Sequence, residues 1–213
     1  MLKIFHRINR LDQLHNVQNS VSPSINFGIE IDVRYHENNL VLHHDPLNHH
    51  INNPILLKDF LKIYNFTGPL ILNIKTEGIE KECINLIQQF NIKNWFFLDL
   101  SMPYFVKYSL IAQNGSINGF TPDNLAVRFS EYEPIEYALS FSNKARWVWV
   151  DCFTKLHLDT TIYKQLKDAG FKICLVSPEL QGHDISRIKE FKEILDLNKI
   201  IIDAVCSKRI DLW

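Results

Sequence analysis

One pattern recurs along most of this chain: a short apolar run, rich in β-branched and aromatic residues, precedes a stretch with apolar residues at helical spacing. The apolar runs predict strands over residues 1–5, 27–34, 69–75, 95–100, 125–129, 146–151, 171–176 and 200–205. The stretches between them predict helices over 11–19, 56–64, 79–90, 101–113, 134–141, 158–169 and 185–195. Such alternation predicts a parallel sheet covered by helices.

Eight such strands in 213 residues predict a compact (β/α)8 barrel, the TIM barrel, with residues 1–213 forming a single α/β domain. A doubly wound open sheet is the alternative, and the missing glycine-rich turn after the first strand disfavours it. A further apolar run at 40–43 is predicted to pair back on the second strand as a hairpin. Polar loops are predicted over 20–24 and 44–53.

The overall composition excludes several classes of protein. The net charge is −1, with 23 basic and 24 acidic residues and no basic block, so we expect no nucleic-acid partner. The first residues become polar too soon for a signal peptide, and no apolar stretch has the length of a membrane span. The four cysteines lack CxxC spacing, which predicts buried free thiols in a reducing compartment and hence a cytoplasmic protein.

Two carboxylates stand out in the second predicted strand. Glu30 and Asp32 are two residues apart, so they point to the same side of the strand, where their charges repel each other. Such a pair is stable only with a cation or basic groups between its members. The hairpin run that follows ends in His43, His44 and Asp45, and imidazoles beside carboxylates suit metal-assisted acid–base chemistry.

The working face of a (β/α)8 barrel lies where its strands end, so polar residues at those ends are the candidates for a site. The candidates are His6, Arg7, Glu30, Asp32, Arg34, His44, Asn73, Lys75, Asp151, Ser177, Glu179 and Asp203. Adjacent strand residues face opposite sides, so only one of His43 and His44 can reach the site. The position next to Asp45 and Pro46 favours His44.

In order and spacing, four short motifs resemble the glycerophosphodiester phosphodiesterase family, one of the phosphatidylinositol phosphodiesterase-like barrels. The motifs are His6-Arg7, Glu30-Ile31-Asp32, His44-Asp45-Pro46 and Asn73-Ile74-Lys75. The resemblance covers residues 1 to about 75, and more loosely the last strand and tail. The middle third matches only in its alternation of strands and helices.

The resemblance implies a phosphodiesterase of lipid metabolism that cleaves a glycerol- or sugar-linked phosphodiester. It makes His6 and His44 the catalytic pair, one removing a proton from the attacking hydroxyl and the other protonating the leaving oxygen. It implies that Glu30, Asp32 and Asn73 hold a divalent cation, Mg²⁺ or Ca²⁺. Substrate contacts are expected from Arg7, Arg34, Lys75 and Asp151, with Lys75 placing a fixed positive charge on the phosphate.

The sequence departs from the family at several points, one of which is the Pro-Glu-Asn stretch that usually follows His-Arg in the family and is not recognisable here. Asn73 stands where the family has an acidic ligand, so the predicted cation site carries one negative charge less. Ile8 stands where the family has a glycine after His-Arg. Two alternatives therefore stay open: a catalytically impaired barrel that binds a phosphorylated ligand, and a lyase that forms a cyclic phosphate. The oligomeric state and the two alcohol groups on the phosphate are not indicated by the sequence.

Overall fold

The structure is a computed structural model that describes residues 1–20, 27–47 and 54–213. Its strands are β1 (Leu2–Phe5), β2 (Phe27–His36), β3 (Asn39–Leu42), β4 (Ile55–Leu56), β5 (Leu70–Ile74), β6 (Trp95–Leu98), β7 (Ala126–Phe129), β8 (Trp147–Val150), β9 (Lys172–Val176) and β10 (Ala204–Ser207). Its α-helices are α1 (Leu11–Ser20), α2 (Leu57–Ile63), α3 (Glu80–Gln89), α4 (Met102–Asn114), α5 (Ile135–Leu139), α6 (Thr160–Asp168) and α7 (Arg187–Leu197). Short 3₁₀ helices are η1 (Pro122–Asn124), η2 (Pro178–Gln181) and η3 (Ile210–Leu212). The loops predicted over 20–24 and 44–53 lie mostly outside the described residues.

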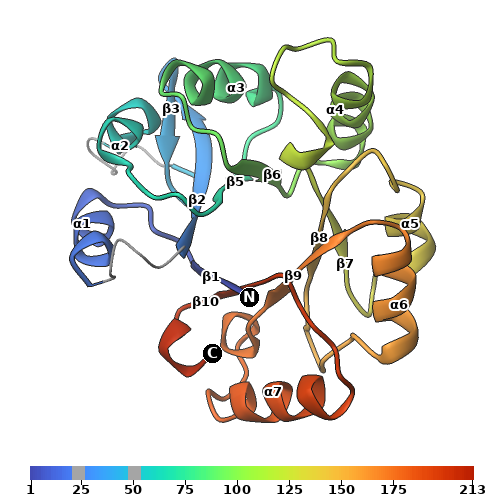
Figure 1. Cartoon of the computed structure of the whole chain (residues 1–213). Helices are drawn as coiled ribbons and strands as arrows, with labels where there is room; N and C mark the ends of the chain where they lie inside the picture. The colour runs from blue at the N-terminus through green and yellow to red at the C-terminus, as the bar shows by residue number, and fades with distance from the viewer. Residues whose placement is uncertain (21–26, 48–53) are drawn as a thin grey trace.

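Eight of the strands are parallel and form one curved sheet. Their order is β7-β8-β9-β10-β1-β2-β5-β6, and Figure 1 shows them at the centre with the helices around them. Between β6 and β7, one isolated parallel bridge joins Phe97 to Leu125, and it is the only pairing of that edge among the described residues. The predicted parallel sheet covered by helices is confirmed, and this strand order is the one that a (β/α)8 barrel has. The predicted hairpin is also confirmed, because β3 pairs antiparallel with the end of β2.

Strand alternation gives the sheet two apolar layers. The outer layer packs between the strands and the helices, while a separate inner cluster fills the space that the strands surround. In the inner cluster the rings of Phe96 and Trp147 stack with their centroids 4.9 Å apart. Inward-facing positions further along the same strands carry polar residues, so the apolar interior ends in a polar layer at the carboxyl ends of the strands.

Gly28 shows how closely the first strands approach each other. A Cβ at this position would lie 2.6 Å from the Pro69 carbonyl oxygen and 3.0 Å from Cγ1 of Ile4. No side chain fits in that space, so glycine is required where β2 passes β1 and the start of β5. The close approach matters for the site, because Gly28 begins the inward-facing series that continues with Glu30 and Asp32.

The prediction for the last strand was wrong in its bounds. β10 begins at Ala204, so the apolar run at 200–202 is a loop in which Ile200 and Ile202 pack against the core. Asp203 therefore precedes the strand and lies at the end of the sheet opposite the polar layer. Its Oδ2 accepts hydrogen bonds from the Ile173 backbone N–H at 2.8 Å and from Lys167 Nζ at 2.9 Å. Asp203 is thus not part of the predicted site.

Two further expectations can be compared with the structure. All four cysteines are free and buried, as their spacing predicted. No helix among the described residues is long and apolar enough to cross a membrane. The two-residue strand β4 was not predicted, because two apolar residues carry no detectable period.

Candidate active site

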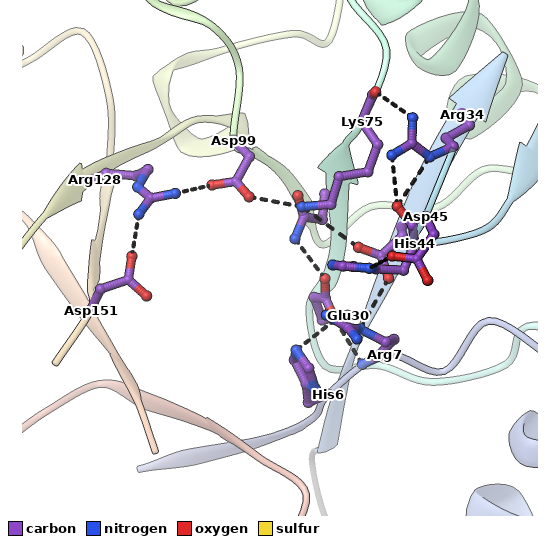
Figure 2. Close-up of polar contacts among 12 residues, drawn as sticks. His6, Arg7, Glu30, Arg34, His44, Asp45, Lys75, Asp99, Arg128 and Asp151 are labelled. Atoms are coloured by element: carbon purple, nitrogen blue, oxygen red, sulfur yellow. Dashed lines mark hydrogen bonds and ion pairs between the residues drawn. The ribbon is translucent and has the colours of Figure 1, made fainter. Parts of the chain in front are cut away.

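Residues from β1, β2 and β5 meet at the carboxyl ends of these strands. His6 and Arg7 directly follow β1, and Glu30 and Asp32 lie within β2. Asp32 pairs in register with Asn73 of β5, so their side chains lie next to each other on the inner side of the sheet. We call His6, Arg7, Glu30, Asp32 and Asn73 the first cluster. Figure 2 shows its labelled members together with Lys75.

Glu30 is almost completely buried, and protein donors hold both of its oxygens. The Arg7 backbone N–H donates to Oε2 at 2.7 Å, and Asn73 Nδ2 donates to Oε1 at 2.9 Å. Arg7 can aim its N–H at Glu30 because its backbone turns into the left-handed region, with φ 57°. Burial, and next the negative charge of Asp32, raise the pKa of Glu30 to about 7.

Asp32 is held by a residue that the sequence did not indicate. Asn9 Nδ2 donates to Asp32 Oδ2 at 2.7 Å, and the Asp32 backbone N–H donates to Asn9 Oδ1 at 2.8 Å. Arg7 Nε lies 3.5 Å from Oδ2 and Lys75 Nζ lies 3.7 Å from Oδ1. Two cationic groups therefore stand beside the carboxylate pair, as the repulsion between Glu30 and Asp32 requires.

His6 is a neutral imidazole in this environment. Its side chain is 14% exposed, and Nε2 lies 3.8 Å from Glu30 Oε2. Burial lowers the pKa of His6 to about 3, and the charge of Arg7 contributes in the same direction. Its Nδ1 has no hydrogen-bond partner among the described residues. A neutral imidazole at the edge of a cavity can accept a proton.

His44 lies at the end of the hairpin, and its ring is fixed by its neighbour. Its Nδ1 donates to Asp45 Oδ1 at 2.8 Å, which leaves Nε2 for other contacts. The side chain is 37% exposed, and its charge is among those that lower the His6 pKa. His43 Nδ1 donates instead to the Asp45 carbonyl oxygen at 2.7 Å. The two adjacent histidines thus bind different atoms of one residue.

Arg34 binds the backbone of two segments of the site. Its Nε and Nη2 donate to the His44 carbonyl oxygen at 3.1 and 2.7 Å, and its Nη1 donates to the Lys75 carbonyl oxygen at 3.0 Å. The guanidinium therefore ties the hairpin end to the end of β5. Arg34 does not line the cavity beside His6, and its predicted contact with substrate stays a prediction.

A chain of ion pairs continues across the ends of β6, β7 and β8. Arg128 Nη1 lies 2.9 Å from Asp99 Oδ1, its Nη2 lies 2.9 Å from Asp151 Oδ2, and its Nε lies 3.3 Å from Glu133 Oε1. We call these four residues the second cluster. Lys75 joins the two clusters, because its Nζ donates to Asp99 Oδ2 at 3.0 Å (Figure 2).

Asp151 is the most deeply buried member of the second cluster. Its side chain is 5% exposed, and Gln181 Nε2 donates to its Oδ1 at 2.7 Å. Burial raises the pKa of Asp151 to about 7, although the charge of Arg128 acts in the opposite direction. A carboxyl group with this pKa changes charge near neutral pH.

A cavity of about 200 Å³ connects the two clusters. Its polar wall is formed by His6, Arg7, Asn73, Lys75, Asp99, Arg128, Asp151 and Gln181. Its apolar wall is formed by Leu98, Trp149, Phe153, Val176 and Leu180. The cavity is large enough for a small polar group, and the side chains of Arg7 and Lys75 line it. Two cationic side chains in a cavity of this size suit an anion such as a phosphate.

The structure adds residues to the predicted site and removes others. Asp99 and Arg128 were missed although they stand at the carboxyl ends of predicted strands, which was the signal used for the other candidates. Ser177 and Glu179 do not line the cavity. Glu179 instead binds the Ser207 hydroxyl at 2.6 Å and the Lys208 backbone N–H at 3.0 Å, which fastens the end of β10.

The donor atoms of the first cluster fit a hard divalent cation in part. Asp32 Oδ1 and Asn73 Oδ1 are buried oxygens without a hydrogen-bond partner in the described structure, and hard cations prefer such donors. Glu30, however, already accepts two hydrogen bonds. The described residues contain no group of three or more histidine, cysteine, aspartate or glutamate side chains suited to a metal ion.

Comparison with solved structures gives close matches in fold. A glycerophosphodiester phosphodiesterase from Agrobacterium tumefaciens str. C58 superposes with a TM-score of 0.66 at 15% identity, over 100% of this chain and 97% of that one. A glycerophosphoryl diester phosphodiesterase from Parabacteroides distasonis ATCC 8503 superposes with a TM-score of 0.66 at 11% identity, over 99% of this chain and 84% of that one. The chain has the fold of these two proteins. No protein-family model matches the sequence, and no match was found among curated proteins.

Proposed function

We propose that this chain is a metal-assisted phosphodiesterase of the glycerophosphodiester phosphodiesterase family, built on a closed (β/α)8 barrel. The observation that carries the proposal is the first cluster. Together with Lys75, it brings a neutral imidazole, a buried carboxylate pair and two cationic side chains to the carboxyl ends of the strands, beside a cavity that His6, Arg7, Asn73 and Lys75 line. The resemblance of four motifs and the shared fold of two glycerophosphodiester phosphodiesterases support the same assignment.

In the proposed reaction, an oxygen nucleophile attacks phosphorus, the bond from phosphorus to one alcohol oxygen breaks, and that alcohol leaves. His6 removes the proton from the attacking hydroxyl, because it is neutral and lies at the cavity edge. His44 donates a proton to the leaving oxygen from Nε2, while Asp45 fixes its ring through Nδ1. The proton removed by one imidazole is thus balanced by the proton given by the other.

Arg7 and Lys75 bind the phosphate oxygens in this proposal, since both line the cavity. Asp151 contacts the substrate from the opposite wall, and Arg34 contributes by fixing the segments that carry His44 and Lys75. Glu30, Asp32 and Asn73 would hold a divalent cation, Mg²⁺ or Ca²⁺. When bound, the cation neutralises negative charge on a phosphoryl oxygen.

A second function is favoured by one specific contact. The Asn73 amide donates to Glu30, so a neutral group stands beside the carboxylate pair and lowers the negative charge available to a cation. A barrel with a weakened cation site could bind a phosphorylated ligand without turnover. A lyase reaction on the same groups would instead give a cyclic phosphate, with a substrate hydroxyl as the nucleophile in place of water.

A ³¹P NMR time course on glycerophosphodiesters separates these functions, because diester, monoester and cyclic phosphate have distinct signals. The reaction is run with Mg²⁺, with Ca²⁺ and with a chelator. We expect a phosphomonoester as product and loss of turnover with the chelator. A cyclic phosphate would identify a lyase. Phosphate binding without turnover under any condition would contradict the enzyme and favour the binding function.

Two adjacent histidines provide a matched control for the acid–base pair. His44→Gln is expected to lower kcat by roughly 10²–10⁴-fold, which is the usual contribution of a positioned general acid. In the described structure the His43 ring binds the Asp45 carbonyl oxygen, and His43→Gln should retain most of the activity. The opposite result would transfer the role of general acid to His43.

A further inference from the structure

A second and larger cavity lies beside the proposed active site, between α4 and α5. Its volume is about 440 Å³. Most of its lining is apolar, formed by Leu100, Met102, Phe105, Val127, Tyr132 and Tyr137. Polar groups enter it only where it meets the second cluster, at Asp99, Arg128 and Glu133. An apolar cavity of this size with a few polar groups at one end is the usual form of a small-molecule site.

The architecture explains why a cavity forms at this place. One isolated bridge alone links β6 to β7 in the described structure, so the sheet offers little backbone pairing there. The helix that follows β7 is α5, which has only five residues, whereas α4 on the other side has thirteen. The short helix covers less of the sheet edge, and the cavity lies at this boundary between α4 and α5.

The two cavities share a wall. Asp99 and Arg128 line both of them, and Figure 2 shows these side chains between Lys75 and Asp151. Both side chains already have partners of opposite charge, because Arg128 pairs with Asp99, Asp151 and Glu133 and Lys75 also pairs with Asp99. This wall therefore does not require a charged ligand group on its apolar side, so one molecule can place an anionic group in one cavity and an apolar group in the other.

The entrance of the larger cavity exposes apolar surface. Met102 is 60% exposed and Tyr132 is 73% exposed, and both line the cavity. Exposed large apolar side chains at the rim of a hollow are typical of a ligand-binding groove. Burial of an alkyl chain against them would remove apolar surface from water on both sides of the contact.

We propose that this cavity binds an alkyl arm on one alcohol of the phosphodiester, while the phosphate lies beside His6, Arg7 and Lys75. The proposal rests on the proposed function and specifies its substrate class. The substrate is an amphiphilic phosphodiester rather than one with two small polar alcohols. The shared wall of Asp99 and Arg128 places the apolar arm next to the phosphate.

Two synthetic substrates test this directly: the ethyl and hexyl esters of glycerol phosphate, which differ only by four methylenes. We expect kcat/KM to be at least about tenfold higher for the hexyl ester, since each buried methylene favours binding. Binding of hexyl phosphate and ethyl phosphate, measured by isothermal titration calorimetry, gives a readout that does not depend on turnover. We expect hexyl phosphate to bind more tightly than ethyl phosphate in this measurement.

Variants on one helix provide the control. Met102→Glu puts a charge on the cavity wall and is expected to reduce the hexyl preference to within about twofold, because a charge opposes burial of an alkyl chain. Leu110→Gln changes an exposed residue of α4 that does not line the cavity, and it should keep the full preference. Both positions are exposed, so neither substitution disturbs the core.

The outcomes separate this inference from the proposed function. Turnover of both esters at equal rates, with equal binding of the two phosphates, would overturn the alkyl site and leave the phosphodiesterase intact. Absence of turnover together with tighter binding of hexyl phosphate would support the alkyl site and contradict the enzyme. A hexyl preference that survives Met102→Glu would place the alkyl chain elsewhere and overturn the inference.

Discussion

The two clusters at the carboxyl ends of the strands use charge in different ways. In the first cluster, polar atoms remain available: Nδ1 of His6 and one oxygen each of Asp32 and Asn73 have no hydrogen-bond partner in the described structure. In the second cluster, every carboxylate forms an ion pair with Arg128, and Arg128 Nε and Asp151 Oδ2 likewise have no hydrogen-bond partner in the described structure. The clusters differ in the groups they contain, because the first has an imidazole that can accept a proton, whereas the second has only carboxylates around one guanidinium. We therefore assign the chemistry to the first cluster.

A matched pair of substitutions gives the sharpest test of this difference. Asp32→Asn removes a charge from the first cluster, and Asp99→Asn removes one from the second. We expect kcat/KM to fall by about 10³-fold or more for Asp32→Asn, because electrostatic stabilisation of the transition state is lost, and by about tenfold or less for Asp99→Asn. Steady-state kinetics on one diester measures both. Equal losses would show that the two clusters share the chemistry.

Asp151 gives the second cluster a pH dependence of stability, as Glu30 does in the first cluster. Its pKa is about 7 in the folded protein, above its ordinary value of 3.8, so the folded state binds more protons between these values. Stability from this group is therefore present below pH 4 and is lost as the pH rises to 7. Relative to Asp151→Asn, the free energy of unfolding of the wild type should fall by at most about 4 kcal/mol over that range. Urea unfolding of both proteins at several pH values measures it, and a parallel pH dependence would contradict the burial argument.

A substitution at Asn73 tests how the negative charge of the Glu30–Asp32 pair is neutralised in the first cluster. Asn73→Asp removes the amide donor to Glu30 and adds a third carboxylate, so the free energy of unfolding without metal should fall by about 2–3 kcal/mol. The same variant should bind Mg²⁺ about tenfold more tightly and recover stability as the ion is added. Thermal unfolding with and without Mg²⁺ reports both effects. A variant that is destabilised but unaffected by Mg²⁺ would contradict the cation site.

Arg34 carries the smallest expected effect. Arg34→Lys keeps the charge but cannot donate to the carbonyls of His44 and Lys75 together, so it should misplace both side chains slightly. We expect kcat to fall about tenfold with little change in KM, as for loss of positioning rather than of substrate binding. A rise in KM with kcat unchanged would instead support the predicted contact between Arg34 and substrate.

Much of the fold could be predicted because it depends on local pattern. Alternating apolar runs and helical stretches gave the parallel strands in their order, and the hairpin after β2 followed from its turn. The last strand was misplaced because Ile200–Ile202 reads as a strand in sequence, while in the structure Asp203 binds the Ile173 backbone and β10 starts only afterwards. Which apolar run joins a sheet depends on such tertiary contacts.

Less of the candidate site than of the fold could be predicted from local pattern. The motifs placed His6, Glu30, Asp32 and Lys75 at one end of the sheet, because strand ends and two-residue spacing determine that position. Asn9 could not be found, since its contact with Asp32 depends on how the chain turns after β1. The hydrogen bonds from Arg34 to the carbonyls of His44 and Lys75 also depend on tertiary packing. No spacing in the sequence indicates these hydrogen bonds.

The central claim is that His6 acts directly on a phosphodiester. The measurement that tests it is the initial rate of glycerophosphodiester cleavage by the wild type and by His6→Gln, with Mg²⁺ present and with folding of both proteins checked by circular dichroism. We predict cleavage by the wild type and a rate at least about 10²-fold lower for the folded variant. Equal rates for the two proteins would contradict the claim and place the chemistry outside the first cluster.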